Sequence, residues 1–73
     1  MKKDIYTLIG QKLRNKREDK KYSQLKVCLH CDISLSTVRN IEHHKQRVQI
    51  HIIEKVANYL GLSLAQLFKE IKR

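Results

Sequence analysis

Apolar residues recur every three or four positions in five short segments. Four of these segments are directly preceded by a residue of a type that caps helix N-termini. Asp4, Ser23, Ser34 and Ser63 each stand immediately before such a segment. An oxygen on a short side chain accepts a hydrogen bond from a free N–H group in the first helical turn, so Ser and Asp are favoured there. A spacing of three or four residues keeps apolar side chains on one helix face. The pattern therefore predicts a chain built from five helices.

The predicted helices are short and follow one another closely. The first follows Asp4 and ends near Lys20, the second covers 24–31, the third 35–43, the fourth about 49–60, and the last begins at Ser63. Gly61 suits the left-handed turn that ends a helix. The chain has no proline and only two glycines, which argues against a turn-rich β protein. The residues expected to face inward are Ile5, Ile9, Leu13, Val27, Cys28, Cys31, Val38, Ile41, Ile50, Ile53, Val56, Ala57, Leu60, Leu64, Leu67, Phe68 and Ile71.

Length and charge narrow the function. Residues 1–73 leave room for one domain, and no repeat or linker divides them. Sixteen Lys and Arg against seven Asp and Glu give a net charge of +9, which favours a polyanionic partner. No apolar run reaches the roughly 18 residues that a membrane span needs, and no export segment begins the chain. We therefore expect a cytoplasmic protein that binds nucleic acid and not a membrane.

The segments 24–31 and 35–43 have the form of a helix-turn-helix, because two short helices are joined there by a tight turn. In the second of them Val38 and Ile41 face inward. The outward face is too polar for a core and carries Leu35, Ser36, Arg39 and Asn40. Taken alone, such a face is more often plain solvated surface. Its place behind a tight turn favours a role in reading DNA.

The same region resembles a known family through a set of short motifs. They are Ser23-Gln24, Ile33-Ser34, Ser36-Thr37-Val38 and Ile41-Glu42, with Cys28 where a small residue is usual. These residues resemble the helix-turn-helix of the lambda-repressor/Cro-type (Xre-like) family. The likeness continues on both sides, from Ile9-Gly10 and Leu13 to Leu60-Gly61-Leu62-Ser63 and Leu67-Phe68. It implies an all-α, five-helix, lambda-repressor-like DNA-binding domain whose third helix enters the major groove.

The resemblance also implies a role for each residue of the site. It places Leu35, Ser36, Arg39 and Asn40 at base edges. Arginine pairs with guanine O6 and N7, asparagine pairs with adenine, and leucine packs on a thymine methyl group, each good bidentate contact giving roughly 1–3 kcal/mol of discrimination. Contacts to the DNA backbone, which fix register without reading sequence, are assigned to Gln24, Thr37, His43, Lys45, Gln46 and Arg47.

Arg17 and Glu42 stand where the family commonly has a structural ion pair, and a bidentate bond between them would fix the reading angle. Other positions depart from the family pattern. Asp32 occupies a turn position that is often glycine, so a left-handed backbone is expected at an aspartate. His44 replaces another usual glycine and Val48 stands near a usual proline, so the path of the loop 43–49 is not predicted.

The family implies a homodimeric transcription regulator, a repressor or controller protein, on a palindromic operator in double-stranded DNA, with recognition helices about 34 Å apart. Its last helices commonly form the dimer contact, which here offers Leu60, Leu62, Leu64 and Phe68. Two other classes stay open. One is an antitoxin or other protein-interaction module that binds a toxin or another protein, which an exposed apolar patch would favour. The other is a nonspecific, charge-driven binder of nucleic acid.

The cysteines and histidines come near a zinc-finger spacing and miss it. Six residues separate His44 from His51, where about three to five are usual. Cys28 and Cys31 fall on an inward stripe, so we expect buried thiols and neither a metal nor another cofactor, with zinc binding as the first alternative and a redox switch as the second. No acid, nucleophile or phosphate-cradling glycine loop accompanies the four histidines, so the sequence does not predict an enzyme.

Overall fold

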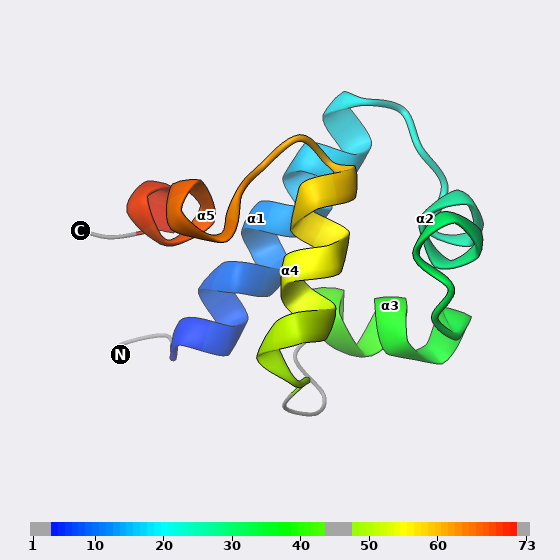
Figure 1. The fold of residues 1–73 in the computed structure, drawn as a ribbon, viewed down its shortest axis with the longest axis horizontal. Coiled ribbons are helices and arrows are strands. Elements are labelled where there is room, and N and C mark those ends of the chain that lie inside the picture. The colour runs from blue at the N-terminus through cyan, green and yellow to red at the C-terminus, as the bar shows by residue number, and fades with distance from the viewer. Residues whose placement is uncertain (1–3, 44–47, 72–73) are drawn as a thin grey trace.

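The computed structural model describes residues 4–43 and 48–71, and within them the chain forms five helices and no strand. The helices are α1 (Ile5–Asp19), α2 (Gln24–Cys31), α3 (Leu35–His43), α4 (Ile50–Tyr59) and α5 (Leu64–Ile71). Figure 1 shows them in this order along the chain. The all-α fold predicted from the apolar spacing is confirmed, and each helix boundary that was predicted agrees with the structure within one residue.

Each of the four predicted caps closes the first turn of its helix. The N–H of Thr7 donates to Asp4 Oδ1 at 2.9 Å, and the N–H of Lys26 donates to Ser23 Oγ at 3.0 Å. At α5 the bonds are reciprocal, because the Gln66 N–H donates to Ser63 Oγ at 3.0 Å and the Ser63 N–H donates to Gln66 Oε1 at 2.9 Å. These bonds satisfy backbone groups that a helix start leaves without partners, so the caps fix where the helices begin.

Three turns use left-handed backbone. Asp32 has φ 57° and ψ 47°, which is the left-handed conformation expected at this aspartate. Gly61 has φ 89°, as suits the residue after α4. Lys21, with φ 60°, was not foreseen. A residue with a Cβ atom is strained in the left-handed conformation. Lys21 and Asp32 therefore form the tight turns on either side of α2 at some cost in free energy.

One cluster of buried side chains joins all five helices. Its members are Ile9, Leu13, Val27, Cys28, Cys31, Val38, Ile41, Ile53, Val56, Ala57, Leu60, Leu62 and Leu67. Two of the residues predicted to face inward are exposed instead, since Ile5 and Ile50 are each 50% exposed. Both occupy the first position of their helix, so they carry the right periodicity but extend past the end of the core. Leu64, Phe68 and Ile71 are partly buried and pack against the cluster.

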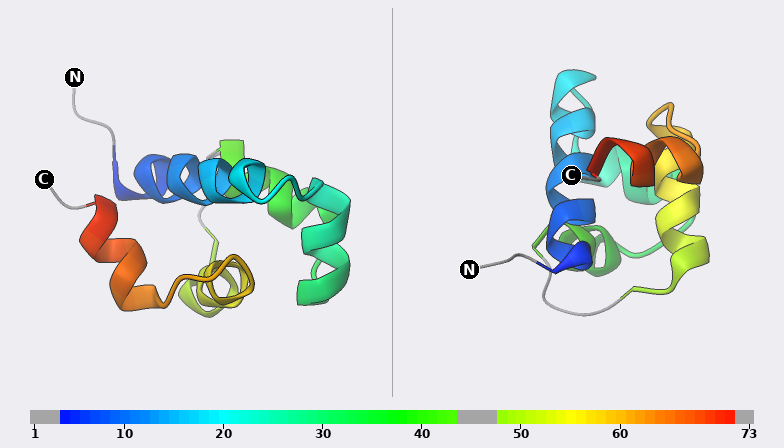
Figure 2. Two further views of the ribbon diagram at one scale, coloured as in Figure 1. Left: turned by 90° about the horizontal axis from the view of Figure 1, so that it is seen from above. Right: turned by 90° about the vertical axis from the view of Figure 1, so that its left-hand side faces the viewer.

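The arrangement separates α2 from α5. In Figures 1 and 2 the start of α1 and all of α5 lie at one end of the molecule, and α2 lies at the other. The packing contacts pair α1 with α3 and α5, and α2 with α3 and α4. Helix α4 stands in the middle and also packs on α5. No helix in the described ranges is long and apolar enough to cross a membrane.

Candidate nucleic-acid interface

Helix α3 has one buried face and one open face. Val38, Ile41 and Glu42 are buried against the rest of the molecule. Ser36, Arg39 and His43 are exposed, whereas Leu35, Thr37 and Asn40 are partly buried. Leu35 packs against the core cluster, so its side chain has less freedom to meet a base than that of Arg39. The side chains predicted to read bases therefore lie along the open side of α3 and at its edges.

The start of α3 is held by hydroxyl groups. The N–H of Thr37 donates to Ser34 Oγ at 3.0 Å, and the two hydroxyl oxygens lie 2.8 Å apart in a shared hydrogen bond. This arrangement fixes the rotamer of Thr37, for which the sequence predicts a phosphate contact. The oxygen of a hydroxyl has further hydrogen-bonding capacity, so the bond to Ser34 is compatible with that contact.

The pair Arg17 and Glu42 joins α1 to the end of α3. Arg17 Nε donates to Glu42 Oε2 at 2.7 Å, and Arg17 Nη2 donates to Glu42 Oε1 at 3.1 Å. A third bond runs from Arg17 Nη1 to the carbonyl oxygen of Tyr22 at 2.7 Å. Hydrogen bonding to Glu42 raises the pKa of Arg17 above its already high value. The guanidinium thus joins α1, the turn before α2 and α3.

Gln24 completes this network from the start of α2. Its Nε2 donates to Glu42 Oε1 at 3.0 Å, so the Glu42 carboxylate accepts three hydrogen bonds. The sequence predicts that Gln24 contacts a DNA phosphate. An amide nitrogen carries two donor hydrogens, so one remains for a phosphate while the other is held by Glu42. The bond therefore sets the direction in which the amide of Gln24 points.

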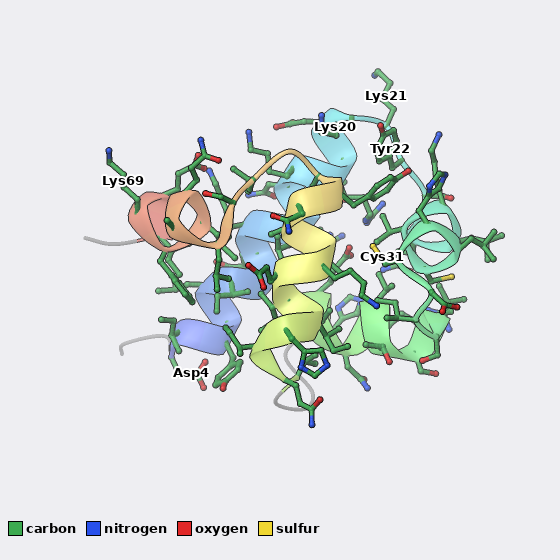
Figure 3. All side chains as sticks on the ribbon, in the orientation of Figure 1. Asp4, Lys20, Lys21, Tyr22, Cys31 and Lys69 are labelled. Atoms are coloured by element: carbon green, nitrogen blue, oxygen red, sulfur yellow. The ribbon has the colours of Figure 1, made fainter. Side chains whose placement is uncertain are left out.

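A column of aromatic rings fills the seam between α2 and α4. The rings of Tyr22 and Tyr59 stack with centroids 5.3 Å apart, and the ring of His30 stacks on Tyr59 at 4.7 Å. Lys26 Nζ lies 4.6 Å from the centroid of the Tyr22 ring. Figure 3 shows Tyr22 in this region, beside the upper part of α2. Partial desolvation raises the pKa of Tyr59. No local pattern in the sequence indicates that these three rings meet.

Cys28 and Cys31 are buried free thiols, as their place on the inward stripe predicts. The Sγ of Cys28 donates to the carbonyl oxygen of Leu25 at 3.1 Å, and the Sγ of Cys31 to that of Lys55 at 3.8 Å. Burial raises the pKa of the Cys31 thiol. Within the described ranges no group of three or more His, Cys, Asp or Glu is placed to hold a metal ion.

The residues suggested for a dimer contact divide into two sets. Leu60 and Leu62 are only 2% and 4% exposed, so their assignment to an interface is wrong. They belong to the core because the turn after α4 folds back onto it. Leu64 and Phe68 are partly buried, and each keeps some surface that a second copy can cover. Lys45, Gln46 and Arg47, predicted to contact the DNA backbone, lie outside the described residues.

Helix α2 also carries an apolar stripe that faces solvent. Leu25 is 54% exposed and Leu29 is 70% exposed. They stand four residues apart, so they lie on one face of the helix. That face is opposite Val27, which is buried in the core. Neither leucine belongs to a motif or to an inward stripe that the sequence predicts.

Known proteins share both the sequence pattern and the fold. Residues 13–67 match the model of a family described as helix-turn-helix. Control protein C.MunI from Mycoplasma sp is 31% identical over 71 residues, which span 96% of this chain and 96% of that protein. The crystal structure of the clp gene regulator ClgR from Corynebacterium glutamicum has a TM-score of 0.88 and 21% identity, covering 97% of this chain and 76% of that one. This second likeness concerns the fold alone.

Proposed function

The chain belongs to the helix-turn-helix family of the lambda-repressor type, and we propose that it binds a palindromic operator as a homodimer and regulates transcription from there. In this proposal α3 lies in the major groove. The observation that carries it is the division of α3 into two faces, with Val38, Ile41 and Glu42 buried and Ser36 and Arg39 open to solvent. The proposal places the protein in the cytoplasm, as a repressor or a controller protein.

Direct readout follows from the chemistry of the open face. Arg39 is exposed and has the chemistry to donate two hydrogen bonds to a guanine, and Asn40, at the edge of the face, has the chemistry to pair with an adenine. Gln24 and Thr37 then bind phosphates and set the register, together with His43 at the end of the helix. Glu42 restrains the amide of Gln24, so the phosphate contact and the reading angle depend on the same carboxylate.

The proposed dimer is supported by the family resemblance and by the apolar surface that α5 leaves exposed. A palindromic site requires two recognition helices about 34 Å apart, related by a two-fold axis. Leu64 and Phe68 lie on α5, at the end of the molecule away from α2, and retain exposed surface. We assign the contact between copies to this side of α5. A Phe68→Lys variant should sediment as a monomer and lose operator affinity.

The decisive experiment selects bound sequences from randomised duplex DNA at about 150 mM salt, with the unchanged protein and with Arg39→Ala and Asn40→Ala. We expect a palindromic motif in which each variant relaxes different base positions. Lys69→Ala is the matched control, because it removes an exposed positive charge from α5 and should leave the motif unchanged. An absence of any motif, with binding that only weakens as salt rises, would refute sequence-specific reading and support charge-driven binding.

A second candidate function is a protein-interaction module such as an antitoxin, and the exposed stripe of Leu25 and Leu29 favours it. The selection experiment separates the two functions when it is repeated with Leu25→Ser/Leu29→Ser. If operator binding is the main function, this double variant keeps the motif and the affinity. An unchanged protein that selects no motif, but binds a toxin encoded beside it through these leucines, would establish the module instead.

A further inference from the structure

The helix-turn-helix is attached to the rest of the molecule at two places of different chemistry. Helix α3 packs on α1, where the Arg17–Glu42 pair fastens its end. Helix α2 packs on α4, where the stacked rings of Tyr22, His30 and Tyr59 lie. The first attachment is a charged pair that is nearly buried, and the second is a partly exposed aromatic column. None of the DNA contacts in the proposed function involves the rings of this column.

The column joins three segments that are distant in sequence. Tyr22 belongs to the turn before α2, His30 to the last turn of α2, and Tyr59 to the end of α4. Stacking therefore holds both ends of α2 against one ring of α4. The carbonyl of Tyr22 also accepts the hydrogen bond from Arg17 Nη1, so the column and the charged network meet at this residue. A tilt of α2 on α4 would disturb both.

We propose that Tyr59, stacked between Tyr22 and His30, is a positioning residue that sets the angle of α2 and α3 on α4 and thereby the ability of the protein to prefer its operator. This inference rests on the proposed function. Base-edge hydrogen bonds need donors within a few tenths of an ångström of their place, whereas phosphate contacts tolerate more movement. A looser α2 therefore weakens specific binding more than nonspecific binding.

The partial exposure of the column also favours a positioning role for Tyr59. His30 is exposed, and Tyr22 and Tyr59 are half-buried side chains that pack against the edge of the core cluster. Their stacking geometry, with interplanar angles of 27° and 16°, restricts how α2 can move across α4. A restraint made before binding lowers the ordering cost that specific docking would otherwise carry. On this inference the column acts on recognition in addition to the stability that its packing against the core supplies.

The test compares the operator with a nonspecific duplex of equal length, at one salt concentration and at a temperature where circular dichroism shows each variant folded. Tyr59→Leu and His30→Ala should lower the ratio of specific to nonspecific affinity roughly three- to tenfold. Tyr59→Phe keeps the ring and should restore the ratio to within about twofold. The double variant should be no worse than Tyr59→Leu alone, because both changes remove the same stack.

Tyr6→Leu is the matched control. Tyr6 is a half-buried tyrosine on α1, outside the α2–α4 seam, and its loss should leave the ratio unchanged. A ratio that stays constant in folded Tyr59→Leu, or one that falls equally in Tyr6→Leu, would overturn the inference. If Tyr59→Leu does not fold, His30→Ala alone decides, since His30 is exposed.

Hydrogen exchange in the DNA-free protein separates this inference from the proposed function. Tyr59→Leu should speed exchange at amides of α2 and α3 and leave α1 and α5 unchanged. If the unchanged protein shows no sequence preference, the proposed function fails, and exchange still decides whether the column restrains α2. Equal acceleration in all helices would mean that Tyr59 serves general stability, and the positioning role would be refuted.

Discussion

The guanidinium of Arg17 and the carboxylate of Glu42, 25 residues apart in the chain, face each other through two hydrogen bonds of 2.7 and 3.1 Å. Their side chains are only 12% and 4% exposed. A charge removed from water in this way is costly unless its partner stays, so the two residues depend on each other. We therefore expect the pair both to stabilise the folded state and to hold the end of α3 against α1.

Arg17→Ala should lower the free energy of unfolding by about 3 kcal/mol, because it leaves Glu42 buried without its countercharge. Urea unfolding measures this change. Arg14→Ala is the control: Arg14 bonds Glu18 on the same helix, but the two side chains are 50% and 51% exposed, so the loss should stay below about 0.5 kcal/mol. Equal unfolding midpoints for the two variants would contradict a structural role for Arg17.

Lys21→Gly should raise the free energy of unfolding by about 0.5–1 kcal/mol, because Lys21 has φ 60° and glycine adopts this conformation without strain. The neighbouring Lys20 has φ −83°, an ordinary helical value, so Lys20→Gly should destabilise by a similar amount. Thermal unfolding of both variants provides the comparison. Two shifts of the same sign would show that the backbone at Lys21 is not under strain.

The carboxyl group of Glu70 should titrate below the ordinary range for glutamate. Its pKa is lowered chiefly by the hydrogen bond from Lys12, whose Nζ lies 2.7 Å from Oε1 and ties α5 to α1. Because the pKa of Glu70 is lower in the folded state, its interaction with Lys12 stabilises the fold at pH values above the unfolded pKa, about 4.3. This stabilisation is lost as the pH falls through the folded pKa. NMR titration of Glu70 should show the shift, and Lys12→Met should abolish it. An identical midpoint in the variant would exclude Lys12 as the cause.

Cys31 should react slowly with iodoacetamide in the folded protein. Burial raises the pKa of its thiol, and the thiolate is the reactive form. The raised pKa also means that stability falls as the pH rises from the ordinary thiol value towards the folded one. Alkylation rates of Cys28→Ala with and without urea isolate Cys31. A rate that urea does not increase would show that this thiol is accessible in the native state.

Local signals in the sequence predicted most of the helical framework. A cap such as Ser63 acts within its own first turn, so the bond to Gln66 depends on residues three positions apart and can be anticipated. The left-handed Asp32 and the pairing of Arg17 with Glu42 were anticipated because the family resemblance assigns those positions. Such signals need no knowledge of how distant segments pack.

Features that depend on packing were harder to predict. The family resemblance suggests which segments meet in a dimer but not which of their side chains stay exposed, so it offered Leu60 and Leu62 for the contact although both lie in the core. Apolar spacing could not show that Ile5 lies beyond the end of the core. The aromatic column unites residues from three segments, and nothing local to any one ring indicates the other two.

The division of α3 into a buried and an exposed face means that some of its residues can be substituted while others cannot. Val38, Ile41 and Glu42 are buried in the core or bonded to Arg17, whereas Ser36 and Arg39 are exposed to solvent. Substitutions at the open positions can therefore accumulate without loss of the scaffold. If the proposed function holds, descendants of one ancestral gene can in this way acquire different operators, and a designer can change the operator preference by altering a few side chains on a constant scaffold.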